Sequence, residues 1–294
     1  MSEQDALAQQ EILKQLNANT INAYRELWTL NARRNLYDYK KGKKINNIAT
    51  YLPDMSRTPI VVCGGGPSLD EQIPFLKEVR DKVVIFAVDM SLMALLNNGI
   101  EPDFLVNVDA EGDLIKKQFM HIDQKKRLKT FLLFSVYTNP ECLEAWPGRV
   151  MYYKLYDPSN PVYTELGNNF YSNLYGVPSK LNVGDFTVCM CCQFSKYIAF
   201  AGIDFAFYKN KYRADGCLNF DEDPKFNKDE CLLVQDYQGN DIYTTDLMLD
   251  YSKQFHMNLL EYEKYAKLFN LSKGIVQRPY QMEEFKDYLT NILN

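Results

Sequence analysis

The feature that most constrains this chain is a series of short apolar runs separated by amphipathic stretches. The runs are rich in β-branched and aromatic residues, which favour strands. They cover residues 60–63, 83–88, 104–108, 130–136, 149–153 and 197–202. A strand that is apolar on both faces must be covered on both faces, which is typical of parallel sheets. The sequence therefore predicts an α/β fold, a Rossmann-like and mostly parallel sheet with helices on both faces.

Helical spacing of apolar residues extends this prediction to both ends of the chain. We expect an N-terminal helical segment within 1–50 and one Rossmann-like domain over 56–294, with a helical C-terminal part from about 245. The expected helices cover 5–40, 69–79, 91–97, 185–195, 244–270 and 281–293, with a hairpin around 238–240. The segment 157–183 is rich in Asn, Tyr, Ser, Pro and Gly, and it predicts one long loop.

Composition excludes several classes of protein. Among 294 residues, 33 are basic and 38 acidic, and the net charge of −5 argues against a nucleic-acid binder that relies on a broad positive field. The most apolar stretch, 187–207, is broken by polar residues, so we expect no membrane span. The start, Met-Ser-Glu-Gln-Asp, does not resemble a secretory signal. Seven cysteines, an odd number, indicate reduced core thiols and a cytoplasmic protein.

The sharpest local motif joins the first predicted strand of the sheet to the helix after it. It reads Gly64-Gly65-Gly66-Pro67-Ser68. Glycines let the backbone turn tightly and approach a ligand, and Ser68 and Glu71 have the spacing of a capping box. The open N–H groups of such a helix start favour a phosphate. The alternative is a tight turn with no ligand. Because Leu69 replaces the third glycine, the motif is not a dinucleotide fingerprint.

Acidic residues gather after the next two predicted strands. Asp89 ends the second strand, while Asp109, Glu111 and Asp113 follow the third. Open α/β sheets bind ligands at the carboxyl ends of their strands. These carboxylates are therefore candidates to bind ribose hydroxyls, or to hold Mg²⁺ beside substrate phosphates. The alternative is helix capping, which we favour for Asp113, whereas we expect Asp89 and Asp109 to be functional.

A third segment follows the last of these predicted strands. It reads Gly202-Ile203-Asp204-Phe205, with Tyr208 and Tyr212 shortly after it. Tyrosine hydroxyls donate hydrogen bonds to phosphate oxygens without adding charge. We therefore expect Asp204, Tyr208 and Tyr212 to contribute to the same ligand site.

The predicted loop 157–183 carries several aromatic side chains among turn-forming residues. They are Tyr163, Phe170, Tyr171 and Tyr175. Because the loop begins at the carboxyl edge of the sheet, one prediction is a mobile lid that closes over a bound donor. The alternative, which the sequence supports equally, is a packed surface loop whose aromatic side chains fill the seam with the C-terminal helices.

Three segments in this order resemble the motility-associated factor (Maf) proteins. They are Gly64 to Leu69, Phe86 to Asp89 and Gly99 to Asp109. The same domain family includes the MptE-like 6-hydroxymethylpterin diphosphokinases, and the resemblance covers roughly residues 58–270. It implies a bacterial, cytoplasmic glycosyltransferase that moves a nonulosonic acid, such as pseudaminic or legionaminic acid, onto flagellin.

A more distant similarity is to bacterial sialyltransferases that use CMP-sialic acid and need no metal. It implies that the glycine loop and the turn Asn182-Val183-Gly184 hold the nucleotide, although Val183 stands where those enzymes have serine. It also implies that Tyr208 and Tyr212 support the departing phosphate. Asp241 lies near the position of their histidine base.

The leading hypothesis is a Maf-like transferase that moves a nonulosonic sugar from a CMP-activated donor to a protein acceptor such as flagellin, with no cofactor. In this hypothesis Asp89 or Asp109 contacts ribose or base, and Asp241 deprotonates the acceptor. One alternative is a pyrophosphoryl transferase of the diphosphokinase type, in which Asp109 and Glu111 hold Mg²⁺ between ATP phosphates. The other is a catalytically degenerate binding protein. The sequence leaves self-association open.

Overall fold

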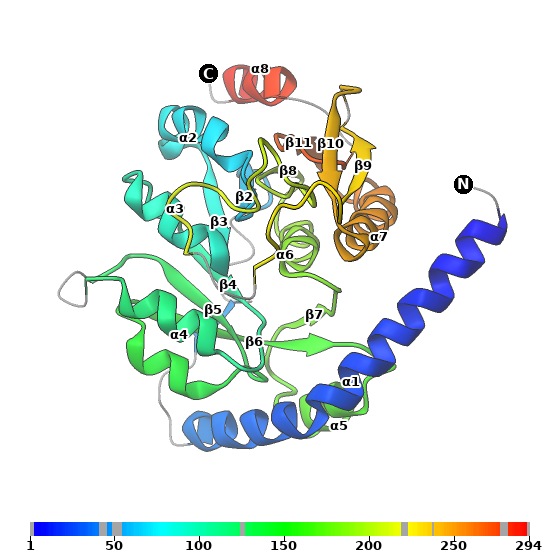
Figure 1. Cartoon of the computed structure of the whole chain (residues 1–294). Helices are drawn as coiled ribbons and strands as arrows, with labels where there is room; N and C mark the ends of the chain where they lie inside the picture. Colours follow the sequence, from blue (N-terminus) through cyan, green and yellow to red (C-terminus); the bar gives the residue numbers. More distant parts are fainter. Residues whose placement is uncertain are drawn as a thin grey trace.

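Parallel strands in one sheet form the centre of the chain (Figure 1). The computed structural model describes residues 3–40, 46–48, 55–123, 127–218, 223–236, 238–276 and 282–292. The strands of the sheet are β1 (Asn46–Asn47), β2 (Ile60–Cys63), β3 (Val84–Val88), β4 (Phe104–Asn107), β5 (Phe131–Ser135), β6 (Arg149–Tyr156), β7 (Gly176–Pro178), β8 (Tyr197–Ala201) and β11 (Lys267–Asn270). Their order is β1-β6-β5-β4-β3-β2-β8-β11, with β7 beside β6, and these pairings are all parallel. The expected α/β fold is confirmed.

Helices connect these strands and cover the sheet. They are α1 (Glu3–Lys40), α2 (Leu69–Glu78), α3 (Leu92–Asn97), α4 (Asp113–Met120), α5 (Pro161–Phe170), α6 (Val183–Cys191), α7 (Asp246–Tyr262) and α8 (Met282–Ile292). Short 3₁₀ helices include η2 (Arg80–Lys82), η3 (Asp89–Ser91) and η4 (Pro140–Ala145). The crossovers through α2, α3 and α4 step in one direction across the sheet, so their right-handedness places them on one face. The return to β8 runs through α6, which contacts β2, β3, β4 and β8.

The direction of the chain across the sheet reverses between β2 and β8. From β2 the chain adds strands toward β6, and later adds β8 and β11 on the other side of β2. The loops after β2 and β8 therefore leave the sheet in opposite directions, and this opens a crevice where open α/β folds bind ligands. In the parallel register Cys63 lies beside Ala201, so the glycine loop that follows β2 meets the turn at Gly202.

Aromatic residues hold the central strands in register. Phe86 on β3 is paired with Phe104 on β4, which is paired with Phe131 on β5. Their rings stack with centroids 4.5 Å and 5.9 Å apart. Cross-strand aromatic pairs of this kind stabilise a sheet and oppose slippage of its register. The strand ends that carry the glycine and acidic motifs are therefore fixed relative to one another.

The long helix α1 is fastened to the body by asparagine side chains. Nδ2 of Asn31 donates to the carbonyl oxygens of Ala110 and Tyr137, at 2.8 and 2.9 Å. Nδ2 of Asn35 donates to two carbonyl oxygens in the segment 136–138, at 2.8 and 2.9 Å. In Figure 1, α1 passes α5, with which it is also in contact, and its N-terminal end points away from the sheet.

The prediction of one long loop over 157–183 is wrong. The segment contains α5 and β7, and Tyr163 and Tyr171 are buried. The hydroxyl of Tyr171 donates to the carbonyl oxygen of Ala32 in α1 at 2.5 Å. Tyr163 and Tyr171 therefore pack against the N-terminal helix and not against the C-terminal helices, whereas Tyr175 packs against Phe194 and Phe170 is exposed. This packing favours the packed alternative over the mobile lid.

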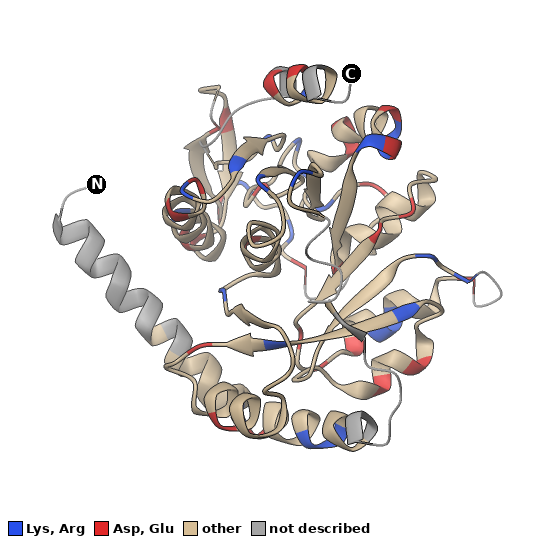
Figure 2. Cartoon of the chain, turned by 180° about the vertical axis from the view of Figure 1, so that it is seen from behind, with Lys and Arg blue, Asp and Glu red and all other residues tan. Residues whose placement is uncertain are grey.

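The helix expected over 244–270 is correct only in its first part. It ends at Tyr262, and the chain then enters β11, which pairs with β8 at the edge of the sheet. The expected hairpin is present as β9 (Leu232–Gln235) and β10 (Asp241–Thr244), which form a separate two-stranded sheet. Seen from behind in Figure 2, acidic and basic residues are interspersed along the elements. In the described part of the chain, no helix combines the length and apolarity that crossing a membrane requires.

Candidate functional site

A cavity of about 330 Å³ opens at the carboxyl ends of β2 and β8, where the strand order reverses. Its walls come from the loops after β2, β3 and β8 and from the starts of α6 and α7. The lining residues are Gly64, Gly65, Gly66, Val88, Met90, Asn182, Val183, Gly184, Gly202, Ile203, Asp204, Phe205, Ala206, Tyr212, Arg213, Pro224, Thr245, Leu247, Met248 and Tyr251. We call this the switch-point cavity. It brings together Gly64, Gly65, Gly66, Asn182, Gly184, Asp204 and Tyr212 from the residues predicted from the sequence.

The glycine loop is held tightly against the neighbouring turn. A Cβ atom on Gly64 would lie 2.3 Å from the carbonyl oxygen of Gly202, and one on Gly66 would lie 2.6 Å from Oδ2 of Asp204. Gly202 itself has φ of +67°, a conformation that side chains disfavour. The glycines at 64 and 66 are therefore required by close packing of the two strand ends, and their backbone forms the floor of the cavity.

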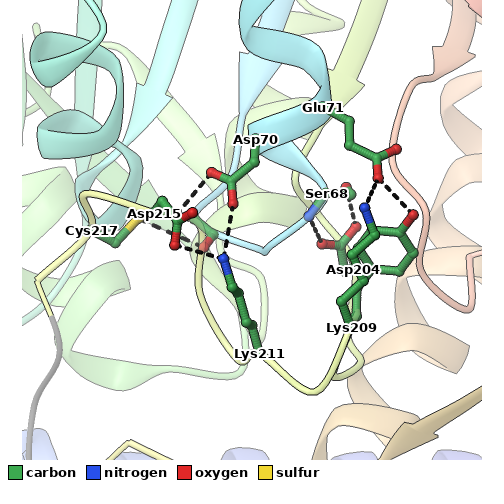
Figure 3. Close-up of polar contacts among 10 residues, drawn as sticks. Ser68, Asp70, Glu71, Asp204, Lys209, Lys211, Asp215 and Cys217 are labelled. Carbon is green, nitrogen blue, oxygen red and sulfur yellow. Dashed lines mark hydrogen bonds and ion pairs between the residues drawn. The ribbon is translucent and has the colours of Figure 1, made fainter.

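The start of α2 is capped from another segment, so the predicted capping box is wrong. The Ser68 hydroxyl donates to Oδ1 of Asp204 at 2.5 Å, and the Ser68 N–H donates to Oδ2 at 2.8 Å (Figure 3). Glu71 instead accepts from the Tyr208 hydroxyl at 2.8 Å and from Nζ of Lys209 at 2.6 Å. The Asp204 carboxylate thus occupies the place that we had expected a phosphate to take.

Asp204 is a buried carboxylate that fixes the loop. Burial raises its pKa, while the hydrogen bonds from Ser68 and from the Lys273 N–H oppose that rise. A carboxylate next to the first N–H of a helix also interacts favourably with the helix dipole. Asp204 therefore acts as a bridge between the end of β8 and the start of α2, and only part of it faces the cavity.

The start of α6 offers the open donors that α2 does not. Oδ1 of Asn182 accepts from the N–H of Asp185 at 2.9 Å, which caps the helix. Its Nδ2 is buried and has no hydrogen-bond partner among the described residues. Val183 and Gly184 follow in the first turn and also line the cavity. Because buried polar groups are nearly always satisfied in proteins, this donor indicates a ligand or water acceptor in the cavity.

A buried hydrogen-bond group ties the first turn of α6 to α7. The carboxylate of Asp185 accepts from the Tyr262 hydroxyl at 2.7 Å and from Nδ2 of Asn258 at 2.6 Å. Burial raises the pKa of Asp185 to about 6, although both hydrogen bonds favour its charged form. The orientation of the α6 terminus toward the cavity is therefore fixed by side chains of α7.

The cationic side chain of the cavity, Arg213, was missed in the sequence analysis. Its Nε donates to Oδ2 of Asp223 at 2.7 Å, and its Nη2 donates to Oδ1 of the same carboxylate. Its guanidinium lies 4.9 Å from the ring centroid of Tyr212. Arg213 follows an irregular segment with no helical or strand pattern. The one signal in the sequence was a basic residue directly after the singled-out Tyr212.

Three polar side chains lie together at the ends of β3 and β4. Asp89 is buried and accepts from the Met90 N–H at 2.7 Å. Burial, together with the charge of Asp109, raises the pKa of Asp89 to about 6, against the effect of the Met90 N–H. Asn107 is fully buried next to Asp89, and its side chain also opposes the rise in the pKa of that carboxyl. Burial also raises the pKa of Asp109.

The remaining predicted residues lie outside the switch-point cavity. Pro67 and Ser68 are buried beneath the loop, and Asp109 lines a second cavity. Asp241 begins β10 and is exposed. Thr245 on the cavity wall is four positions further along the chain, a span of about 13 Å in a strand. Tyr208 donates to Glu71 and is not part of the lining. The two tyrosines therefore do not share the cavity.

Metal ligands are sparse around this edge of the sheet. In the ranges that the structure describes, no group of three or more His, Cys, Asp or Glu side chains is arranged to hold a metal ion. Glu111 is exposed and accepts a hydrogen bond from the Tyr24 hydroxyl at 3.3 Å. The candidate ligand atoms of Asp89, Asn107 and Asp109 are their carboxylate and amide oxygens. Mg²⁺ uses one or two carboxylates together with substrate phosphates, so these residues fit such an ion.

The fold and the cavity define a doubly wound α/β protein with a crevice at its switch point. Residues 31–210 match the family described as 6-hydroxymethylpterin diphosphokinase MptE-like. This match covers more than half of the chain, so the chain belongs to the MptE-like family. The resemblance to the Maf and MptE-like proteins that the motifs indicated is thereby confirmed.

Two known proteins are similar to parts of this chain. A structure of a Maf glycosyltransferase from Magnetospirillum magneticum AMB-1 shares the fold, with a TM-score of 0.56 and 20% sequence identity. The similarity covers 84% of this chain and 38% of that one. An uncharacterized protein from Treponema pallidum (strain Nichols) is 33% identical over 87 residues, which are 29% of this chain and 39% of the relative. The chain therefore spans well under half the length of each.

Proposed function

We propose that the chain is a Maf-like glycosyltransferase that moves a nonulosonic sugar from a CMP-activated donor to a protein acceptor such as flagellin. The observation that supports it most is Nδ2 of Asn182, which finds no partner in the described part of the chain and lies at the start of α6, in a cavity of about 330 Å³ at the switch point. The volume is within the range of small-ligand sites. The shared fold with a Maf glycosyltransferase supports the same proposal.

The phosphate of the donor meets several hydrogen-bond donors in this cavity. The N–H groups at the start of α6 and the amide of Asn182 donate to phosphate oxygens, and the helix dipole favours the negative charge. Arg213 and the Tyr212 hydroxyl lie on the same wall and stabilise the charge that develops on the departing CMP. Gly64 to Gly66 form the floor beneath the nucleoside. Tyr208 is not needed in this arrangement.

The chemical step breaks the bond between the sugar anomeric carbon and the phosphate oxygen. The acceptor hydroxyl forms the new bond to that carbon, CMP leaves with the electron pair, and a base takes the hydroxyl proton. Asp241 is too far along β10 for this role. We assign it to Asp89, a buried carboxylate that does not itself line the cavity but lies in the chain between Val88 and Met90, which do. Its pKa of about 6 is suitable for a general base near neutral pH.

Thermal unfolding with CMP tests the nucleotide part of the proposal. Asn182→Asp keeps the side-chain oxygen that caps α6 but replaces the donor with a second, negatively charged oxygen. We expect millimolar CMP to raise the Tm of the wild-type protein, because ligands that bind only the native state stabilise it. We expect the shift to vanish in Asn182→Asp.

Asn139→Asp is the matched control for this experiment. Asn139 caps η4 through its side chain, as Asn182 caps α6, but lies outside the cavity. Its variant is expected to keep the full CMP shift. A wild-type protein whose Tm does not move with CMP, or an Asn182→Asp protein that responds normally, would contradict the nucleotide assignment.

The second candidate is a Mg²⁺-dependent pyrophosphoryl transferase of the diphosphokinase type. The family match and the group Asp89, Asn107 and Asp109 favour it. When bound there, Mg²⁺ would neutralise charge on ATP phosphates. Calorimetry separates the two candidates, since the glycosyltransferase binds CMP without Mg²⁺, whereas the diphosphokinase binds ATP only with Mg²⁺ and loses that binding in Asp109→Asn.

A further inference from the structure

A second cavity of about 280 Å³ lies between α1 and the carboxyl edge of the sheet. Its walls come from α1, from the residues after β4 and β6, from α5, and from the segment 179–181 before α6. We call it the α1 cavity. No part of the CMP proposal uses it, yet it contains Asp109, one of the carboxylates that the sequence singled out.

Aromatic rings form one wall of the α1 cavity. The rings of Tyr24 and Trp28 stack with centroids 5.9 Å apart, and the Trp28 ring lies 4.9 Å from that of Tyr163. The Asn31 hydrogen bonds to the body and the bond from Tyr24 to Glu111 hold this part of α1 in place. The wall is therefore built into the fold and does not depend on a ligand for its order.

Carboxylates complete the α1 cavity. Asp109 and Asp157 supply hydrogen-bond acceptors, whereas Nζ of Lys180, a third lining residue, lies 5.4 Å from the ring centroid of Tyr262. Flat aromatic faces pack against the C–H face of a sugar ring, while carboxylates accept from its hydroxyls. This combination suits a hydroxyl-rich ring better than an apolar ligand.

The two cavities are neighbours along one short segment of chain. Residues 179–181 line the α1 cavity, and Asn182, Val183 and Gly184 line the switch-point cavity. On the other side, Asp109 of the α1 cavity acts electrostatically on Asp89, which lies between two lining residues of the switch-point cavity. A group bound at the start of α6 is therefore adjacent to both cavities.

We infer that the α1 cavity is the sugar subsite of the donor, with the aromatic wall of Tyr24 and Trp28 as its packing surface and Asp109 and Asp157 as its polar contacts. This inference rests on the proposed function, because the donor's nucleotide then occupies the switch-point cavity. It places the bond to be broken between the two cavities, beside Asp89. The N-terminal helix is thus part of the substrate site.

The test compares CMP with CMP-N-acetylneuraminic acid as probes. In calorimetry, wild-type protein is expected to bind the CMP-sugar at least about tenfold more tightly than CMP, a gain of about 1.4 kcal/mol. Trp28→Leu and the milder Asp157→Asn should each reduce that ratio toward one while leaving CMP affinity unchanged.

Asp157→Asn keeps an oxygen for the turn contacts of Ser159, so it tests the subsite even if Trp28→Leu does not fold. Asp81→Asn, at an exposed position in η2, is the control and should keep the ratio.

The outcomes separate the subsite from the nucleotide proposal. Equal affinities for CMP and the CMP-sugar, or a ratio that both variants leave intact, would overturn the subsite. If CMP itself does not bind, the proposed function fails, and binding of free N-acetylneuraminic acid tests the subsite alone.

The fluorescence of Trp28 measures that binding. The chain has two tryptophans, so a Trp146→Phe protein reports Trp28 fluorescence only. A saturable change with the free sugar supports the cavity, and no change at 100 mM rejects it.

Discussion

Single residues show how a motif can be identified correctly and still be given the wrong contact. Ser68 and Glu71 have the spacing of a capping box, yet Ser68 bonds to Asp204 and Glu71 bonds to Tyr208 and Lys209. Local spacing predicts local partners only. Asp204 is more than a hundred residues away in the sequence, and its carboxylate is a stronger acceptor for the Ser68 hydroxyl and N–H. The sequence therefore located the loop but not the group that fixes it.

Asp89 should make the stability of the protein depend on pH. Burial raises its pKa from 3.8 to about 6. A carboxyl whose folded-state pKa is raised stabilises the protein fully below its unfolded pKa, and this stabilisation is lost as pH rises through 6. Asp89→Asn removes that loss and keeps an oxygen for the Met90 N–H. We expect it to raise the free energy of unfolding by about 3 kcal/mol at pH 7.5 and by about half of that at pH 5.

Urea denaturation at the two pH values measures this difference. Asp81→Asn serves as the reference, because a substitution at an exposed position changes stability by less than about 0.5 kcal/mol. If Asp89 is also the general base, the stabilised variant is inactive. An Asp89→Asn protein that is less stable than wild type at pH 7.5 would show that the buried charge has a partner that stabilises it in the fold.

A secondary-structure element could be predicted from the sequence where the burial of the element follows from its own residues. The six apolar runs became strands because both of their faces are covered, which their composition demands. The segment with α5 was misassigned because Gly167 and the asparagines after it are poor helix formers. Its helix is stabilised by packing of Tyr163 against Trp28 in α1. Strand β11 was likewise hidden, since four residues at a sheet edge carry little pattern of their own.

The docking of α1 should depend on two asparagines more than on its exposed ion pair. Asn31 and Asn35 each donate to two buried carbonyl oxygens, which lose their side-chain donor in an alanine variant. We expect Asn31→Ala and Asn35→Ala each to lower the free energy of unfolding by about 1–3 kcal/mol. Arg34 lies on the same helix and pairs with Glu141 at 2.9 Å, with both side chains exposed.

Chemical denaturation of the three single variants tests this ranking. Arg34→Ala is expected to change stability by less than about 1 kcal/mol, as is usual for exposed ion pairs. If Arg34→Ala proves as damaging as either asparagine variant, the amide contacts are not what fastens α1. The asparagines gave no signal in the sequence, because an asparagine inside a long helix ordinarily faces solvent or weakens the helix.

At the scale of the whole molecule, the candidate site is assembled from six separate stretches of chain. They are the ends of β2, β3 and β8, the starts of α6 and α7, and the segment at Pro224. The sequence could predict the strand ends, because parallel strands bring their carboxyl ends to one edge. It could not predict which of those ends are neighbours. The β2–β8 pairing brings in Asp204 and Arg213 and places Asp109 in the other cavity.

Hydrogen exchange with and without CMP should reveal that assembly directly. A nucleotide in the switch-point cavity is expected to slow exchange together in the segments 64–66, 182–184, 202–206 and 245–251, although they are far apart in the sequence. The largest change should fall on 182–184, where the amides at the start of α6 gain an acceptor.

The internal control is the hollow at the opposite, amino-terminal edge of β8 and β11, lined by Lys196, Tyr197 and residues 263–268. That region touches the same two strands but not the cavity, so its exchange should not change. Equal slowing at both edges would indicate general stabilisation of the fold, and slowing confined to the ends of β3 and β4 would move the nucleotide to the Asp89 and Asp109 group.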